Sequence, residues 1–500
     1  MKKFLLVLFS LAVLLGMFAG VNAEGVHRDT LTVAIDREPK SLLPYVSNDT
    51  GTAPITHQYF ESLLAVDSEM NLQPCLAVSW EVVDELSYRF HLREGVKFQD
   101  GTDFTAADVL YTLEQFTNSP ATSSIVAIDL EKTTIEDDHT ILVVTKDPTP
   151  GFLKMCSLDV MGIVQKAGAE ADPEGYAKAP IGTGPFKFVE WVSGDHIKFE
   201  ANKEWWGGEI AFDTLLIRII PESATRAIEA ENGGVDISRI TISDVPAVAA
   251  DPNVNLILQS ILNTSYISFN CSVKPFDDPK VRQAVSLAVD TEAIVYAVYG
   301  EYAEVSKSFV APTITGYYEA DSEFVGYDPE KAKALLTEAG YPNGFECTLV
   351  SNGNQSIAEM IQAQLAEIGI NVKLNVTDFS NWLDAIVNGK QQMYIGGWTV
   401  PSGDATEAFS AFDSAFFGAG GNRSFYSNPD ADALLQVIYS EMDEAKRAQA
   451  CADLQQLLAD EAVTIGLNIG YSYWVTGKDI SGFQVLPTQT MNFAYITFEK

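Results

Sequence analysis

The sequence predicts an α/β protein whose sheet contains parallel strand pairs. Three observations support this class: strands and helices alternate from about residue 269, residues 64–200 mix strands with helices, and 47% of all residues are hydrophobic. Strands that alternate with helices are joined by crossover connections, which place neighbouring strands parallel. At roughly 150 residues per domain, a chain of 500 residues is expected to form two to four domains.

Residues 1–23 have the pattern of a secretory signal peptide. Lys2 and Lys3 precede an apolar run over residues 4–18, and small residues follow up to Ala23. The apolar run is shorter than the ~20 residues that a membrane-spanning helix needs. No cysteine lies near Ala23, so a lipid anchor is not expected. We therefore expect export with cleavage after Ala23 and a mature protein in a bacterial periplasm.

The first part of the mature chain is predicted to be rich in strands. Residues 30–36 form the first expected strand, and the apolar–polar alternation over residues 88–92 is typical of a half-buried strand. Thr105 followed by Asp108 has the spacing of an N-terminal helix cap. Another β-rich stretch covers residues 140–145. This part of the chain is therefore predicted to form a compact α+β unit.

The second part repeats strand and helix units. Asp278-Pro279 and Asp328-Pro329 each place a capping carboxylate before a proline, which predicts the start of a helix. Gly340 is placed to end the second of these helices. The further expected elements are a strand at 346–350, a helix through 357–368, a strand at 370–376, a helix at 382–387, a strand at 392–396 and helices that begin at 429 and 444.

The charge of the chain excludes two classes of partner. The chain has 32 Lys and Arg against 68 Asp and Glu, which gives a formal net charge of -36. Such a surplus repels the phosphates of nucleic acids and the surface of anionic lipids. The high hydrophobic content also excludes intrinsic disorder. An acidic, globular, multi-domain protein without a nucleic-acid partner remains.

No motif for catalysis or for cofactor binding stands out. The five histidines are not spaced as metal ligands on one helix, and the five cysteines contain no C-x-x-C. The chain has no Walker A, G-x-G-x-x-G or G-x-S-x-G sequence. We expect no catalytic residue, no metal and no cofactor. A secreted hydrolase acting on peptides or glycans stays open as an alternative, because the chain has many carboxylates.

Several short sequence strings follow one another in order along the mature chain. The first is PCLAVSW at 74–80, which has the pattern P-x-L-A-x-x-W. The other strings are LREGVKFQDG at 92–101, TAADV at 105–109, GTGPF at 182–186, WWGG at 205–208, FN at 269–270, PKVRQA at 279–284 and YSNP at 426–429. Taken together, these strings resemble the large extracytoplasmic solute-binding proteins of ABC importers, the peptide/nickel-binding family, and the resemblance covers nearly the whole mature chain.

The resemblance implies a two-lobed periplasmic-binding-protein fold, the Venus flytrap, with three domains and a discontinuous domain I. Ligand then lies between the lobes and is buried when they close. The implied segments are 1–23 for the signal peptide, 24–63, 206–270 and 477–500 for domain I, 64–205 for domain II, and 271–476 for domain III.

The resemblance also implies a ligand anchor at Asp404. Gly397, Trp398, Thr399 and Asp404 follow the expected strand at 392–396, and they resemble the W-T and G-D of the dipeptide-binding branch. In that branch the aspartate pairs with the α-ammonium of the ligand. The edge beyond the carboxyl end of a strand is also where open α/β sheets bind ligands. The alternative is that Asp404 caps a helix over residues 405–412.

Other residues are candidates for contacts with the ligand. Trp398 can line a side-chain pocket, with a core position as the alternative. A short glycine loop could offer backbone N–H groups to a carbonyl or carboxylate; its residues are Gly182, Thr183 and Gly184. Asn422 and Arg423 follow a glycine-rich run, and Arg423 could receive a carboxylate.

The chain departs from the dipeptide-binding branch at one place. That branch has an arginine for the terminal carboxylate before the helix at 357–368, and residues 351–356 here contain none. This departure favours a longer peptide, an amine-bearing non-peptide or a different carboxylate anchor. The expected partners are a small peptide or peptide-like ligand and an inner-membrane ABC permease, and the expected state is a monomer. A binding receptor for chemotaxis or signalling is a further alternative.

Overall fold

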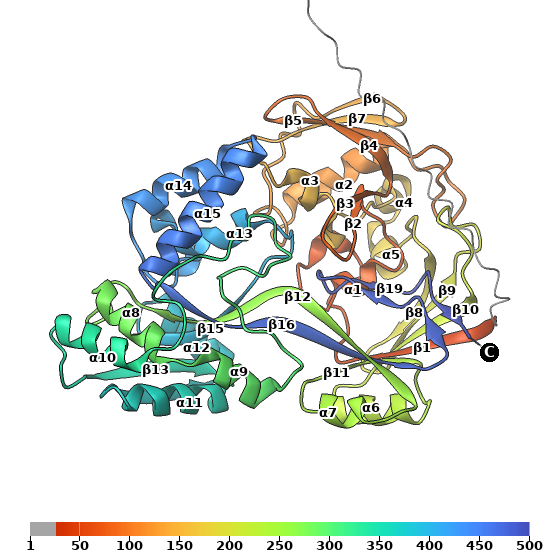
Figure 1. Cartoon of the computed structure of the whole chain (residues 1–500). Helices are drawn as coiled ribbons and strands as arrows, with labels where there is room; N and C mark the ends of the chain where they lie inside the picture. Colours follow the sequence, from red (N-terminus) through yellow and green to blue (C-terminus); the bar gives the residue numbers. More distant parts are fainter. Residues whose placement is uncertain (1–26, 50, 500) are drawn as a thin grey trace, which may run out of the picture.

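The computed structural model describes residues 27–49 and 51–499, so the predicted signal peptide lies outside the described residues. The protein has two lobes that are joined by two long strands, β12 (Val254–Phe269) and β16 (Thr464–Gly477) (Figure 1). The first lobe holds most of residues 27–250 together with the C-terminal segment, and the second lobe holds residues 270–460. This arrangement confirms the predicted α/β, two-lobed class.

One ten-stranded sheet runs through both lobes. Its strands, in spatial order, are β14 (Asn371–Thr377), β13 (Glu346–Asn352), β15 (Met393–Thr399), β12, β16, β11 (Ile237–Ile240), β1 (Arg28–Ile35), β10 (Phe212–Ile219), β9 (His196–Ala201) and β8 (Phe186–Val192).

The antiparallel pair β12–β16 connects the halves of this sheet. Its pairing extends from Val254 opposite Gly477 to Ser268 opposite Thr464. The register shifts between Ser260 and Thr264 and again between Thr264 and Tyr266. Irregular pairing of this kind bends a strand and increases its local twist. The two lobes therefore share a hydrogen-bonded connection that is least regular near its middle.

The strand–helix units of the second lobe confirm the sequence prediction. β13 pairs in parallel with both β14 and β15. Asp278 accepts the backbone N–H of Lys280 at 2.9 Å, and Asp328 accepts that of Lys331 at 2.9 Å. The helices here are α8 (Pro279–Ala288), α9 (Thr291–Tyr299), α10 (Pro329–Glu338), α11 (Gln355–Ala366), α12 (Phe379–Val387), α13 (Ala405–Phe409), α14 (Pro429–Ser440) and α15 (Glu444–Asp460).

The first lobe carries the predicted α+β unit. A four-stranded sheet has the order β4 (Ala77–Val82), β5 (Ser87–Leu92), β7 (Thr140–Val144) and β6 (Thr134–Asp137). The backbone N–H of Thr105 donates to Asp108 at 3.0 Å, which confirms the cap of α2 (Ala106–Asn118). The other helices of this lobe are α1 (Ala53–Thr56), α3 (Phe152–Met155), α4 (Lys166–Ala171), α5 (Pro173–Lys178), α6 (Ser223–Glu231) and α7 (Val245–Ala249). Short strand pairs join β2 (Leu64–Val66) to β3 (Leu72–Pro74), β17 (Ile480–Ser481) to β20 (Thr497–Phe498), and β18 (Gln484–Val485) to β19 (Met491–Asn492).

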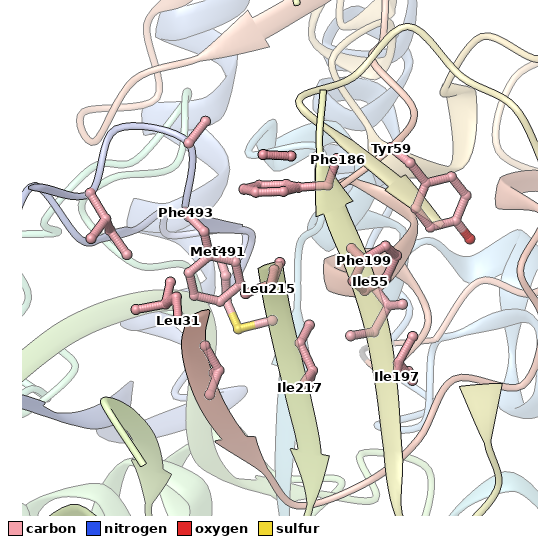
Figure 2. Close-up of a cluster of buried hydrophobic side chains, with 14 of the residues drawn as sticks. Leu31, Ile55, Tyr59, Phe186, Ile197, Phe199, Leu215, Ile217, Met491 and Phe493 are labelled. Carbon is pink, nitrogen blue, oxygen red and sulfur yellow. The ribbon is translucent and has the colours of Figure 1, made fainter. Parts of the chain in front are cut away.

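The two ends of the described chain share one hydrophobic core. Leu31 on β1 and Leu215 on β10 are fully buried, and Met491 and Phe493 from the C-terminal segment belong to the same cluster (Figure 2). Other clusters fill the α+β unit and the second lobe. The C-terminal segment therefore covers the sheet of the first lobe, and we propose that it forms the last part of domain I.

Three details differ from the prediction. The predicted boundary at residue 205 places β8 and β9 in domain II, whereas both strands extend the main sheet through β10. We therefore propose that domain II ends before β8. β15 continues to Thr399 because residues 397–399 pair with β12, so Gly397 to Thr399 do not form a loop. The helix expected over 405–412 ends at Phe409 and is followed by a 3-10 turn. All five cysteines are free.

His57, at the end of α1, ties together three segments of the first lobe. Its Nδ1 lies 2.9 Å from Asp159 Oδ1, and Asp159 Oδ2 accepts a hydrogen bond from Thr490 at 2.9 Å. Burial lowers the pKa of His57, but the carboxylate of Asp159 outweighs burial and raises this pKa above the usual value. Thr490 belongs to the C-terminal segment, so the network fastens that segment to the lobe.

We predict that His57→Gln destabilises the protein more at pH 5.5 than at pH 9. The folded state favours protonated His57, so its stabilisation is complete below the unfolded pKa of about 6.5. This stabilisation is lost as the pH rises through the raised pKa of the folded state. Urea unfolding of both proteins at the two pH values measures the difference. An equal loss at both values would contradict the ion pair.

Candidate ligand-binding site

The predicted site residues fall into two groups in the structure. Gly182, Thr183 and Gly184 lie in the first lobe between α5 and β8. The residues from Gly397 to Asp404, together with Asn422 and Arg423, lie in the second lobe, where Trp398 packs against an apolar cluster that also includes Val66 and Met70 of the first lobe. The two groups do not form one cluster of side chains.

The glycine loop of the first lobe packs against the backbone of Tyr59. The N–H of Gly184 donates to the carbonyl of Tyr59 at 3.1 Å, and the N–H of Gly182 donates to Gln99 Oε1 at 3.2 Å. A Cβ atom at position 182 would lie 1.7 Å from the carbonyl oxygen of Tyr59. These two N–H groups are therefore used inside the protein, so we assign Gly182 and Gly184 to close backbone packing.

Thr183 forms part of a buried network around Glu61. Its hydroxyl donates to Glu61 Oε2 at 2.8 Å, and the indole N–H groups of Trp205 and Trp206 donate to the same carboxyl at 3.0 and 2.7 Å. Burial raises the pKa of Glu61, although these three hydrogen bonds oppose the rise. The conspicuous pair of tryptophans thus holds a carboxyl group inside the first lobe. The sequence analysis missed Glu61, which no motif marks.

Asp404 forms a buried ion pair with Arg447 of α15. The two guanidinium N–H groups lie 2.9 and 2.8 Å from Oδ1 and Oδ2 of Asp404, and the side chains of Asp404 and Arg447 are 3% and 11% exposed. Burial would raise the pKa of Asp404, but the hydrogen bonds and charge of Arg447 lower it below its usual value. Asp404 also accepts the N–H of Thr406 at 3.0 Å. Asp404 therefore caps α13, and its carboxylate is paired within the chain.

The first lobe contacts the second lobe beside Asp404. Lys154 Nζ of α3 donates to Thr315 Oγ1 at 2.5 Å and to the carbonyl of Gly403 at 3.3 Å. Gly151 lies so close that a Cβ there would be 3.4 Å from Asp404 Cγ. Burial lowers the pKa of Lys154, and the charge of Asp404 opposes this effect. Charged groups from both lobes therefore meet at the segment that carries Asp404.

Trp398 and Arg423 form a second charged feature of the second lobe. The guanidinium carbon of Arg423 lies 5.5 Å from the centre of the Trp398 ring. The centre of the Phe309 ring lies 6.0 Å from the centre of the same Trp398 ring. Asn263 of β12 donates to the carbonyl of Trp398 at 3.1 Å and to Thr399 Oγ1 at 2.9 Å. The irregular part of β12 thus fixes the end of β15, where Trp398 lies half-buried and Thr399 is exposed.

Asn422 holds the loop that carries Arg423. Its Nδ2 donates to the carbonyls of Asp413 and Tyr426 at 3.0 and 2.8 Å, and its Oδ1 accepts from the hydroxyl of Ser424 at 2.9 Å. Asn422 is fully buried. Its amide is already saturated, so we assign Asn422 to positioning and not to ligand contact.

Two kinds of structural feature are absent from the part of the chain that the structure describes. In residues 27–49 and 51–499, no group of three or more His, Cys, Asp and Glu side chains is arranged to hold a metal ion. Within the same residues, no helix has the length and apolar character needed to cross a membrane.

We predict that Gly182→Ala destabilises the fold by roughly 1–3 kcal/mol, because the new methyl group meets backbone atoms that cannot move aside. Gly397→Ala is the matched control. A Cβ at Gly397 would lie 3.4 Å from the carbonyl oxygen of Thr264, which is an ordinary contact. Urea unfolding is expected to show a loss for position 182 and little change for position 397. Equal effects at the two positions would contradict the packing described for Gly182.

We also predict that Arg447→Met destabilises the protein by about 3–5 kcal/mol, because it leaves Asp404 buried without its partner. The double variant Asp404→Asn/Arg447→Met is expected to recover part of this loss. Chemical unfolding of the single and double variants measures the coupling between the two side chains. If the losses in the free energy of unfolding of the two single variants add up to the loss of the double variant, the two side chains do not interact as the structure indicates.

Comparisons with known proteins identify the family of this chain. Residues 71–419 match the bacterial extracellular solute-binding proteins, family 5. The chain is 30% identical over 485 residues to the glutathione-binding protein GsiB of Escherichia coli strain K12, with 93% of each chain covered.

Solved structures agree with this result. HbpA2 from Haemophilus parasuis has a TM-score of 0.86 at 27% identity, covering 94% of this chain and 100% of that chain. A dipeptide-binding protein from Pseudoalteromonas sp. SM9913 in complex with Met-Leu has a TM-score of 0.77 at 25% identity, covering 94% and 100%. The chain therefore belongs to family 5 of the bacterial extracellular solute-binding proteins.

Proposed function

We propose that this protein captures a small peptide or peptide-like ligand between its two lobes and delivers it to a permease of an ABC importer in the inner membrane. The observation that carries the proposal is the single sheet whose central pair, β12–β16, connects two lobes that each have a hydrophobic core of their own. Such a connection lets two rigid bodies move relative to each other about a few irregular residues.

The relatives support a ligand of this size and chemistry. One relative is named as a glutathione-binding protein, and a solved relative holds Met-Leu. Glutathione and Met-Leu are both short, and each carries an ammonium group and at least one carboxylate. We therefore propose that the ligand of this chain has both kinds of charged group.

The family also decides between binding and catalysis. The matched family and the curated relatives are solute-binding proteins and not enzymes, so the hydrolase considered from the sequence is not supported. Location outside the cytoplasm follows from the family. We propose that the periplasm is the compartment and that residues 1–23 are a cleaved signal peptide.

The second lobe offers the best candidate contacts. We propose that the ligand binds along the end of β15, where Gly397, Trp398 and Thr399 lead to Asp404, with Arg423 beside them. The charge of Asp404 is matched by Arg447, so a ligand ammonium binds this carboxylate only by taking the place of Lys154, whose Nζ reaches the same segment from the first lobe. Gly182, Thr183 and Gly184 form their hydrogen bonds inside the first lobe, so we do not include them among the proposed ligand contacts.

We predict that Met-Leu, glutathione or both bind one-to-one to the purified protein. Isothermal titration calorimetry measures the affinity, and native mass spectrometry of freshly purified protein identifies a ligand that is retained. N-acetylated Met-Leu is the control, because it keeps the shape but lacks the ammonium group and is expected to bind more weakly. If neither probe binds and the retained ligand is not peptide-like, the proposed ligand class is wrong.

A further inference from the structure

Arg423 differs from the other arginines of the chain in having no partner. The chain has ten arginines, all in the described part. Among those residues Arg423 is the only arginine whose guanidinium makes neither a hydrogen bond nor an ion pair, and its Nε is buried without a partner. The chain has 68 acidic residues. An arginine that stays unpaired among so many carboxylates is therefore a local exception.

The surroundings of Arg423 restrict its side chain and remove part of its water. Its guanidinium lies over the ring of Trp398 at 5.5 Å. Burial raises the pKa values of Tyr266 and Tyr394, and the positive charge of Arg423 opposes both rises. A charge in such surroundings has lost hydration that the stacked ring does not replace.

The backbone around Arg423 is also fixed. Gln391 Nε2 donates to the carbonyl of Arg423 at 2.9 Å, and Asn422 anchors the preceding residue through its saturated amide. Trp398 is fixed in turn by Asn263 of β12. The loop therefore presents the guanidinium from a prearranged position, which lowers the entropy lost when a partner binds.

The geometry points to a carboxylate as the missing partner. A guanidinium has five N–H donors in a planar fork, and a carboxylate accepts two of them side by side. We propose that Arg423, stacked on Trp398, forms the subsite that binds a carboxylate of the ligand and makes the protein selective for ligands with a free acid group. This inference rests on the proposed function, because it assigns one part of the same ligand.

A purely structural role for Arg423 leads to a different expectation. In that case the cation–π pair only stabilises the loop, and removal of the guanidinium changes the unfolding curve but not the dependence of binding on the ligand's acid group. The test therefore varies both the side chain and the acid group of the ligand, so that the coupling between them is measured directly.

We predict that Arg423→Met removes the preference for a free acid. The probes are Met-Leu and glutathione, each as the free acid and with its carboxylates converted to amides, titrated by calorimetry. Wild type is expected to bind each free acid about tenfold to a hundredfold more tightly than its amide, because a charge-assisted pair is lost. In Arg423→Met the two forms are expected to bind equally. Arg423→Lys keeps the charge without the fork and is expected to recover part of the preference.

Arg218→Met serves as the matched control, because it removes a guanidinium of the first lobe that is paired with Glu229 and lies outside the proposed contacts, and it should retain the preference for the free acid. An unchanged preference in Arg423→Met, with the variant folded by circular dichroism, would overturn the subsite while the proposed function stands. Failure of all probes to bind wild type would instead remove the proposed function together with the subsite.

Discussion

The antiparallel pair β12–β16 is the interaction on which the rest of the structure depends. It is the only part of the main sheet that connects the strands of the first lobe to those of the second, within the described residues. Its ladder of hydrogen bonds resists separation of the lobes, while its register shifts around Thr264 give it a place to bend. The same stretch of β12 pairs with Trp398 and Thr399, so a bend there would move the proposed ligand contacts directly.

The protein treats its buried charges in three different ways. Asp404 is matched by a full opposite charge on Arg447, Glu61 is surrounded by neutral donors, and Arg423 has only an aromatic face. The first two arrangements are complete within the chain. In the third arrangement the guanidinium of Arg423 has no ionic partner within the chain, although its position is fixed. A binding site needs such an unpaired group in a fixed position before its ligand arrives.

Local sequence signals predicted most of the elements correctly. The Asp-Pro pairs marked the starts of α8 and α10 because capping depends only on neighbouring residues. The end of β15 was missed because Gly396 and Gly397 suggest a turn, whereas pairing with β12 extends the strand to Thr399. Long-range pairing of this kind leaves no mark in the local pattern.

The site was predicted less well than the fold for a related reason. Arg447 lies 43 residues from Asp404 in sequence, so no spacing could have indicated their ion pair. Likewise, the glycine loop at 182–184 was expected to offer free N–H groups, but the carbonyl of Tyr59 accepts the N–H of Gly184 and the side chain of Gln99 accepts that of Gly182. Arg423 was a candidate by residue type alone, and only the structure reveals that it lacks a partner.

Small-angle X-ray scattering, with and without a ligand whose binding has been established by calorimetry, tests the central claim most directly. The account predicts that the radius of gyration decreases on ligand addition while the molecular mass stays that of one chain, because the lobes close about β12–β16. A radius of gyration that is unchanged at full occupancy would contradict capture by closure.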